Sequence, residues 1–202
     1  HQVEVIPEID LPGHSVAMIA AYPYLGCTGE QLEVRKKWGI SKDILCAGND
    51  SVYTFVKDVL DEICQMFPSQ YIHLGGDEAP KDRWCNCEKC RARLTDYDQL
   101  QTYMVEQFRR YLQEKGRKVI CWNDGVNKAT SEEIISQVWK PLTRRSGVKQ
   151  ANKGRKVIMS PTLSMYFDYP YCVTPLYKTF KFKPLRGVKR DRTENVLGAE
   201  GT

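Results

Sequence analysis

Two hydrophobic patterns follow one another along this chain: short runs of branched and aromatic residues, and longer stripes at helical spacing. The short runs predict buried strands. They lie at residues 3–10, 71–74, 118–122, 134–139 and 157–161, with a last strand beginning at residue 196. Because a parallel crossover needs about a dozen residues or more, the helix expected between the third and fourth strands must be lost or vestigial.

The stripes at helical spacing fall between the predicted strands and carry helix caps and stops at their ends. They predict a short helix that Ser15 caps and that runs through Ala21, a helix over residues 52–67 after caps at 49–51, a helix over about residues 98–115 with Gly116 as its stop, and a basic helix at residues 144–153. Residues 23–47 form an irregular stretch too long for an idle connection, and we expect it to belong to the rim of a site. A second long irregular stretch follows residue 161.

Strands that alternate with helices, with polar side chains at successive strand ends, predict an α/β fold of the (β/α)8 TIM-barrel type. A doubly wound open sheet shows the same periodicity. The glycine patterns that cradle phosphates in such sheets are absent, which weakens that alternative.

The composition is that of a globular protein, with a 42% hydrophobic share and no apolar run long enough to span a membrane. The length of 202 residues suits one domain or one piece of a larger one. The chain starts in strand-like sequence without an initiator Met, so we expect it to be part of something longer.

The net charge of +5 is unevenly distributed. Residues 140–192 hold 14 Lys and Arg against 2 Asp and Glu, whereas the remainder holds 16 against 23. A basic segment of this kind could bind nucleic acid or anionic glycans. Because it carries no nucleic-acid motif and its charges are dispersed among Pro, Tyr and Phe, we expect a solvated, loop-rich face and no nucleic-acid partner.

Most of the eight cysteines sit singly in apolar contexts, where cysteine usually acts as a small hydrophobic residue. Cys85, Cys87 and Cys90 differ, because three thiols in one loop could hold zinc or form a disulfide. A structural zinc site normally takes four ligands, and no paired Cys-x-x-Cys elsewhere completes the set. The ligand count therefore disfavours a metal, and the redox compartment stays open.

The strongest candidate site is His73-Leu74-Gly75-Gly76-Asp77-Glu78, at the C-terminal end of a predicted strand. Two glycines let the backbone turn sharply, and the loop can then bring both carboxyl groups into one pocket. Like charges held close together raise one pKa, which suits a general acid. An isolated Asp-Glu pair is usually a solvated turn, but the flanking His and Gly-Gly favour a site.

Further along the chain, Trp122 and Trp139 each end a predicted strand, so in a barrel both would face the same mouth. An indole offers the flat apolar surface that packs against the C–H face of a sugar ring. Tyr166 and Asp168 add a phenol donor and a carboxylate acceptor. A lone Trp is usually part of the core, whereas two at strand ends beside an acid pair favour a carbohydrate pocket.

The motif His-x-Gly-Gly-Asp-Glu resembles the signature of family 20 glycoside hydrolases, the β-N-acetylhexosaminidases. Pro-Glu-Ile-Asp-x-Pro-Gly-His at residues 7–14 resembles a second family motif, and the match runs in order along nearly the whole chain. The resemblance implies that residues 1–202 are one partial catalytic barrel, from about its third strand to the start of its eighth. The family's substrate-binding Arg would lie upstream of these residues, and its Trp-x-Glu element would follow residue 202.

By resemblance, the function is hydrolysis of terminal β-linked GlcNAc or GalNAc, in which the substrate's own acetamido oxygen attacks the anomeric carbon. Glu78 would be the acid and base, Asp77 would hold the acetamido N–H, and Tyr166 would bind the acetamido carbonyl. Asp10, His14 and His73 would support them, with no cofactor and no metal required. The expected partner is a glycan or glycoconjugate with a terminal N-acetylhexosamine, and the resemblance implies a secreted, periplasmic or lysosomal location.

Two other functions remain open from the sequence. One is a relative on the same fold that releases a disaccharide, which needs a larger pocket. The other is a glycan-binding or inactive piece in which the acids only hydrogen-bond a ligand. The preference for GlcNAc or GalNAc and the oligomeric state are not determined by these residues.

Overall fold

The computed structural model describes residues 2–140 and 144–202. Their contacts divide the chain into two compact units, one formed by His1–Ile120 with Asp124–Thr130 and the other by Cys121–Asn123 with Ser131–Thr202. Within each unit the neighbouring strands pair in parallel. The α/β class expected from the sequence is confirmed.

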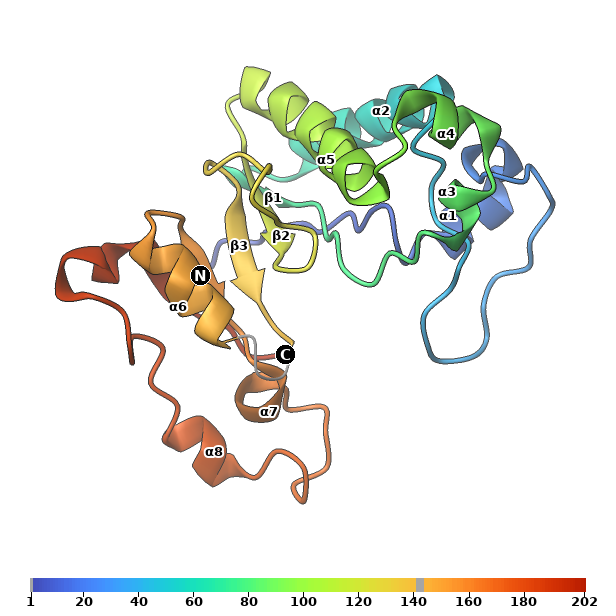
Figure 1. Cartoon of the computed structure of the whole chain (residues 1–202). Coiled ribbons are helices and arrows are strands. Elements are labelled where there is room, and N and C mark those ends of the chain that lie inside the picture. Colours follow the sequence, from blue (N-terminus) through green and yellow to red (C-terminus); the bar gives the residue numbers. More distant parts are fainter. Residues whose placement is uncertain (1, 141–143) are drawn as a thin grey trace. The chain divides into compact units, whose positions relative to one another are not determined.

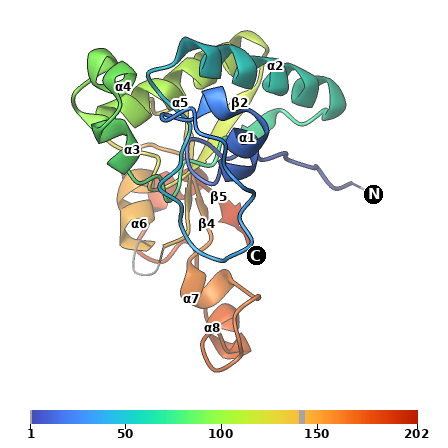
Figure 2. The same ribbon diagram turned by 90° about the vertical axis from the view of Figure 1, so that its right-hand side faces the viewer.

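The first unit carries one strand, β1 (Tyr71–His73), which pairs in parallel with the start of β2 (Lys118–Trp122). Its helices are α1 (Val16–Ala21), the 3-10 turn η1 (Pro23–Leu25), α2 (Asp50–Met66), α3 (Asp82–Cys85), α4 (Glu88–Arg93) and α5 (Tyr97–Glu114). The two long helices α2 and α5 lie side by side (Figure 1), and α3 and α4 adjoin one another (Figure 2).

The long helices form where their caps and apolar stripes predict them. The Asn49 side chain accepts a hydrogen bond from the Ser51 N–H, and Asp96 accepts from the first turn of α5. The chain leaves α5 through Gly116, whose φ of 72° suits a glycine after a helix. The buried faces of both helices, with β1 and β2, form the core of this unit, which includes Val52, Val56, Leu60, Ile72, Leu100, Met104, Phe108, Leu112, Val119 and Ile120.

The second unit holds β3 (Ile135–Val138), β4 (Val157–Met159) and β5 (Val196–Ala199), with α6 (Arg144–Asn152) against β3 and β4 (Figure 1). Gly147 allows this close approach, since a Cβ there would lie 2.8 Å from the Val138 side chain. The core of the unit is Val138, Ala151, Val157 and Met159. The expected loss of a helix before β3 is confirmed, because residues 123–134 contain only turns and coil.

Three sequence predictions about elements are wrong. Residues 3–10 do not form a continuous strand: residues 3–6 are exposed, and only Glu8 forms an isolated bridge to His73, since Pro7 offers no N–H to extend the ladder. Ser15 does not cap α1, because its hydroxyl donates to the Gly13 carbonyl at 2.7 Å. The stretch after residue 161 is not simply irregular, since it holds α7 (Thr162–Met165), α8 (Leu176–Phe180) and the 3-10 segment η2 (Arg190–Asn195).

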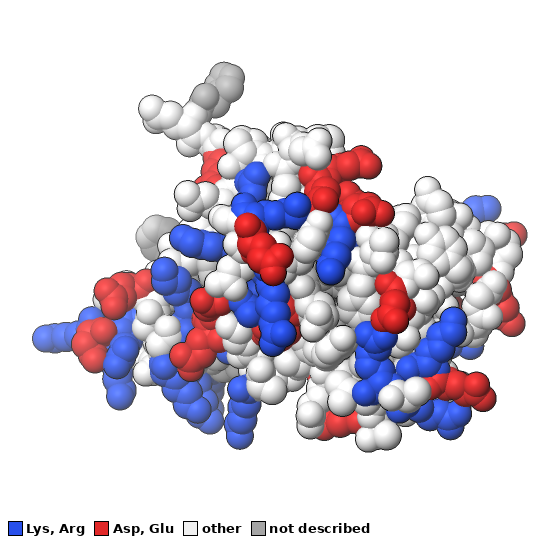
Figure 3. All heavy atoms as spheres, turned by 90° about the horizontal axis from the view of Figure 1, so that it is seen from above, with Lys and Arg blue, Asp and Glu red and all other residues white. Residues whose placement is uncertain are grey.

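The charged side chains are mostly solvated. In the view of Figure 3, positive and negative side chains are interspersed. Most Lys and Arg side chains in residues 144–192 are at least partly exposed, whereas Arg155 is buried and donates to the Ile134 carbonyl at 3.0 Å. The solvated, loop-rich character expected for this segment is therefore found. Among the described residues, no helix is both long and apolar enough to cross a membrane.

Candidate active site

The turn that follows β1 is built around Gly75 and Gly76, both with positive φ (65° and 100°). Asp10 lies directly against this turn: its Oδ1 accepts the Gly76 N–H at 3.0 Å. A Cβ on Gly75 would lie 1.7 Å from the same oxygen, so no residue other than glycine fits there. The segment that carries Asp10 also donates the Ile9 N–H to the His73 carbonyl at 2.9 Å, which ties the two predicted motifs together.

The turn continues into Asp77 and Glu78 between close backbone neighbours. A Cβ on Gly13 would lie 2.7 Å from the Asp77 carbonyl oxygen, and a Cβ on Gly125 would lie 2.8 Å from that of Gly76. Close contacts at Gly13, Gly75 and Gly125, where no Cβ would fit, therefore fix the path of the backbone. Glu78 itself takes a positive φ of 43°, a conformation that an L-residue keeps only when its surroundings hold it there.

Two polar side chains that the sequence did not assign to the site support this turn. Asp124 Oδ2 accepts the Glu78 N–H at 3.2 Å, and Gln101 Nε2 donates to the Gly76 carbonyl at 2.8 Å. Asp124 was detectable in principle, because it follows the strand that ends at Trp122 and so falls at the same sheet edge as Glu78. Gln101 carries no such signal, since a glutamine on an amphipathic helix is ordinary.

The His14 ring lies between the two carboxylates. Its Nε2 is 3.5 Å from Asp77 Oδ2 and 3.3 Å from Glu78 Oε2. The His14 side chain is 39% exposed and that of Glu78 26%, whereas Asp77 is only 14% exposed. One imidazole can thus hydrogen-bond either acid, and the acid that solvent and ligands reach more easily is Glu78.

The carboxyl groups with raised pKa values are Asp10 and Asp77. Burial, and then the charge of Asp77, raise the pKa of Asp10 from 3.8 to about 8. Burial also raises the pKa of Asp77, and the neighbouring His14 opposes that rise. The proton held near neutrality is thus on Asp10, and a protonated Asp10 can donate to Asp77 and leave Asp77 as the charged acceptor. Asp77 Oδ1 is buried and has no hydrogen-bond partner in the part of the chain that the structure describes.

His73 holds the start of the turn through hydrogen bonding. It is buried, its Nδ1 accepts the Gly75 N–H at 2.9 Å, and the same nitrogen lies 3.2 Å from Glu8 Oε1. These contacts fix the start of the turn.

A cavity of about 540 Å³ adjoins the acids, lined by His14 and Glu78 on one side and by residues of the long irregular loop, 34–35 and 37–41, on another. Trp38 in this loop is 99% exposed. The expectation that residues 23–47 belong to the rim of a site therefore agrees with where the loop lies.

The aromatic candidates gather in the second unit. The ring centroids of Trp122 and Trp139 are 6.4 Å apart with the planes at 70°, and Tyr166 stacks on Trp139 at 6.3 Å and 29°. Asn123 Oδ1 accepts the Trp139 N–H at 3.0 Å, which orients the end of β3. All three rings are only partly buried, so they offer an aromatic surface to a ligand.

Asp168 does not join this group as closely, because its side chain is exposed. The ring that continues the group is Tyr169, 6.3 Å from Tyr166. The sequence missed a second polar cluster in this unit, in which Gln137 Nε2 donates to Glu200 Oε2 at 2.9 Å and to Ser160 Oγ at 3.1 Å.

Two groups of described side chains have donor atoms close enough together to surround a metal ion. One is Asp10, His14 and Asp77, which belongs to the acid site. The other consists of Cys27, Cys46, Cys87 and Cys90, away from the acids in the sequence and made only of thiols.

The family model described as the catalytic domain of glycosyl hydrolase family 20 matches residues 1–202. The β-hexosaminidase of Porphyromonas gingivalis is 36% identical over 216 residues, which cover 98% of this chain and 28% of that protein.

Solved structures show the same similarity. The crystal structure of a β-N-acetylhexosaminidase from Bacteroides fragilis superposes with a TM-score of 0.79 at 34% identity, covering 98% of this chain and 42% of that one. An exo β-N-acetylglucosaminidase from Vibrio harveyi, solved with N-acetylglucosamine, gives 0.83 at 25% identity and covers 98% and 34%. The chain spans less than half the length of each of these relatives.

Proposed function

The chain belongs to glycosyl hydrolase family 20, and from this membership we propose that the protein hydrolyses terminal non-reducing β-linked N-acetylhexosamine residues of glycans or glycoconjugates. One observation carries the proposal within the chain. His14 lies between a less exposed carboxylate, Asp77, and a more exposed one, Glu78. Two acids of unequal exposure on one turn can divide the work of a glycosidase into charge stabilisation and proton transfer.

Glu78 is the general acid and base of the proposed reaction. It borders the cavity and is the more accessible acid, so it can reach the oxygen of the leaving group. In the first step it donates its proton to that oxygen as the glycosidic bond breaks. In the second step the Glu78 carboxylate takes a proton from the attacking water and regains its starting state.

The nucleophile is the substrate's 2-acetamido oxygen, which attacks the anomeric carbon and forms an oxazolinium-like ion. Asp77 binds the acetamido N–H through the buried oxygen that has no partner among the described residues, and its charge stabilises the cation. Asp10, protonated near neutral pH, hydrogen-bonds Asp77 from the other side. Attack within one molecule gains from orientation that is already in place, which these contacts provide.

The aromatic group formed by Trp122, Trp139 and Tyr166 is the proposed sugar surface, with the Tyr166 hydroxyl donating to the acetamido carbonyl. Flat apolar rings that remain partly exposed suit the C–H face of a pyranose. Asp168 is the proposed acceptor for a sugar hydroxyl. From membership of the family alone, the proposed location is secreted, periplasmic or lysosomal.

The test is product stereochemistry. The full-length protein is incubated with a chromogenic β-GlcNAc and, separately, a β-GalNAc, and the anomeric proton of the released sugar is followed by NMR at early times. We expect the β anomer first, because two displacements at one carbon retain configuration. Initial release of the α anomer contradicts the mechanism. Glycan binding without turnover points instead to the non-catalytic glycan-binding alternative.

A further inference from the structure

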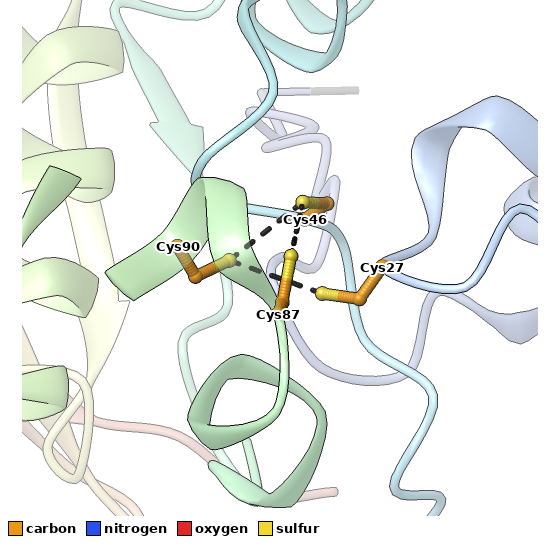
Figure 4. Close-up of side chains that lie close together, drawn as sticks. All are labelled: Cys27, Cys46, Cys87 and Cys90. Carbon is orange, nitrogen blue, oxygen red and sulfur yellow. Dashed lines mark hydrogen bonds between the residues drawn. The ribbon is translucent and has the colours of Figure 1, made fainter. Parts of the chain in front are cut away.

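Four cysteine sulfurs come together in the first unit. The Cys46 sulfur lies 3.6 Å from that of Cys90 and 3.7 Å from that of Cys87, and the Cys27 sulfur lies 3.9 Å from that of Cys90 (Figure 4). All four sulfurs lie within 4.8 Å of one another. Cys46, Cys87 and Cys90 are buried, and Cys27 is partly buried. Figure 4 shows the four side chains pointing toward a common centre.

The chain brings these residues together through backbone contacts. Gly26 and Leu45 form an antiparallel bridge, and the Cys46 N–H donates to the Leu25 carbonyl at 2.8 Å, which sets Cys27 beside Cys46. Cys87 and Cys90 form a Cys-x-x-Cys pair at the start of α4. Gly48 lets the two segments touch, because a Cβ there would lie 2.3 Å from the Cys90 nitrogen.

The spacing of the sulfurs fits a tetrahedral metal site. Sulfurs bound to zinc at about 2.3 Å and at tetrahedral angles are about 3.8 Å apart. The observed separations of 3.6, 3.7 and 3.9 Å match this edge length. Disulfide-bonded sulfurs are about 2.0 Å apart. A disulfide between any of these pairs would therefore require the two sulfurs to approach by well over an ångström. A disulfide would also leave the converging four-fold arrangement unexplained.

The surroundings resemble those of a structural zinc site. The four ligands are all thiols, no position is left for water or substrate, and a closed set of four cysteines is typical of structural zinc. The Gly48 backbone N–H faces the sulfurs of Cys46 and Cys90. Such N–H contacts orient and stabilise thiolates bound to a metal.

We propose that Cys27, Cys46, Cys87 and Cys90 bind one zinc ion. This corrects the ligand count made from the sequence: Cys87 and Cys90 are completed by two single cysteines far away in the chain, and Cys85, the third thiol of the loop, is exposed and stands outside the group. The zinc site is independent of the proposed function, because it takes no part in the reaction.

The ion would connect the irregular loop of residues 23–47 to the segment that follows the turn at residues 75–78. Residues 34–35 and 37–41, between Cys27 and Cys46, line the cavity beside Glu78. The Leu45 N–H donates to the Pro12 carbonyl at 3.0 Å, next to the turn that carries His14. The Trp84 indole N–H donates to the Leu45 carbonyl at 2.9 Å. Loss of the ion should therefore loosen the rim of the cavity before it unfolds the helical core.

The test is metal content of the full-length protein, purified without added chelator and measured by elemental analysis and native mass spectrometry. We expect one zinc per chain in the wild type and in the control variant Cys172→Ser, whose cysteine is exposed and outside the group. Cys46→Ser and Cys27→Ser should both bind zinc at least about tenfold more weakly, since even losses around the ligands cost about 10–100-fold. Cys27 is the least buried ligand, so its variant is the one more certain to fold.

Two further readouts use the wild type alone. Replacing zinc by cobalt should give the sulfur-to-metal charge-transfer absorption of a tetrahedral thiolate site, and removing zinc with a strong chelator should lower Tm, which added zinc restores. A folded protein without zinc, with these cysteines either free or joined in disulfides, overturns the proposal. Iron bound in place of zinc overturns it too, as does undiminished zinc in Cys27→Ser and Cys46→Ser.

Discussion

At the scale of single residues, the two acids of the turn differ in burial rather than in chemistry. Asp77 is 14% exposed and has a raised pKa, whereas Glu78 is 26% exposed and borders the cavity. His14 Nε2 lies within hydrogen-bonding reach of both carboxylates, at 3.5 and 3.3 Å. This difference in burial is the physical basis for giving Asp77 the charge-stabilising role and Glu78 the proton-transfer role.

The role of Glu78 can be tested by the dependence of rate on the leaving group. Glu78→Gln should lower kcat/KM by about 10²–10⁴-fold on substrates with poor leaving groups, because these need protonation most. On aglycones that leave as stable anions, the loss in the bond-breaking step should be much smaller.

The matched control is Glu62→Gln, which changes an exposed acid on α2 in the same way. It should leave kcat/KM unchanged on substrates with poor and with good leaving groups. Steady-state kinetics with a graded series of aryl glycosides measures the effect. An equal loss across the whole series would remove the general-acid assignment from Glu78.

Asp10 gives a prediction about stability and pH. Its pKa is about 8 in the folded protein against an ordinary 3.8, so the folded state holds this proton longer than the unfolded state does. The stability that Asp10 contributes is therefore fully present below its ordinary pKa and is lost as the pH rises through about 8. Asp10→Asn keeps the shape without the charge.

We expect Tm of the wild type to fall between about pH 5 and about pH 9 more steeply than Tm of Asp10→Asn. Thermal unfolding of the full-length protein across this range makes the comparison. Parallel pH profiles for the two proteins would show that Asp10 is already ionised near neutrality and that its proton does not support Asp77.

At the scale of elements, the turn after β1 depends on a glycine that no side chain can replace. Gly75 has φ 65°, and a Cβ there would collide with Asp10 Oδ1 at 1.7 Å. Gly116, after α5, has φ 72° but open space around it. At both positions a residue with a side chain would be strained by the positive φ, but only at Gly75 would its Cβ also collide with a neighbour.

Gly116→Ala should therefore cost about 1–2 kcal/mol of stability and leave activity intact, because it adds only backbone strain. Gly75→Ala should cost more and abolish turnover, because it displaces Asp10 or moves the Asp77–Glu78 turn. Denaturant unfolding and kcat/KM of both variants separate the two effects. A fully active Gly75→Ala would mean that the turn is not held against Asp10.

Much at this scale was predictable from the sequence where signals are local. The stripe and caps of α2, the Gly116 stop of α5 and the strand before Gly75-Gly76 all depend on neighbours within a few residues. What failed depends on distant partners. Residues 3–6 have strand-like composition but no ladder to join, and Cys27 and Cys46 meet Cys90 across gaps of 63 and 44 residues.

For the candidate site too, the residues in local motifs were predicted and those that act from distant elements were not. Asp77, Glu78, Asp10 and His14 were predicted as one site, and the structure brings them together through Gly13, Gly75 and Gly76. The supports Asp124 and Gln101 come from other elements. Asp124 could be found from its place after a predicted strand, whereas a glutamine on an amphipathic helix such as Gln101 carries no signal.

At the scale of the whole molecule, the chain carries many large apolar side chains on its surface. Trp38, Phe180, Val3 and Tyr171 are 99%, 90%, 76% and 73% exposed. Related structures at 25–34% identity come from chains more than twice this length. Where such side chains form a contiguous patch, apolar surface usually marks contact with other protein.

We therefore expect residues 1–202, expressed alone, to be aggregated, molten or inactive when compared with the full-length protein. An exposed apolar surface costs about 25 cal/mol per Å², and a domain has only about 5–15 kcal/mol of net stability. Size-exclusion chromatography, thermal unfolding and turnover of both proteins make the comparison. A monodisperse, cooperatively unfolding and active 1–202 would contradict this expectation.

Attack by the acetamido oxygen is tested most sharply by placing fluorine on the substrate's acetamido group. Aryl β-GlcNAc substrates with zero to three fluorines on the acetyl methyl differ little in shape, but each fluorine makes the carbonyl oxygen a poorer nucleophile. If that oxygen attacks the anomeric carbon while Asp77 holds the N–H, kcat/KM of the full-length protein must fall progressively along the series. Rates that do not change with fluorination, or a sugar ester trapped on Asp77, would contradict the proposed mechanism.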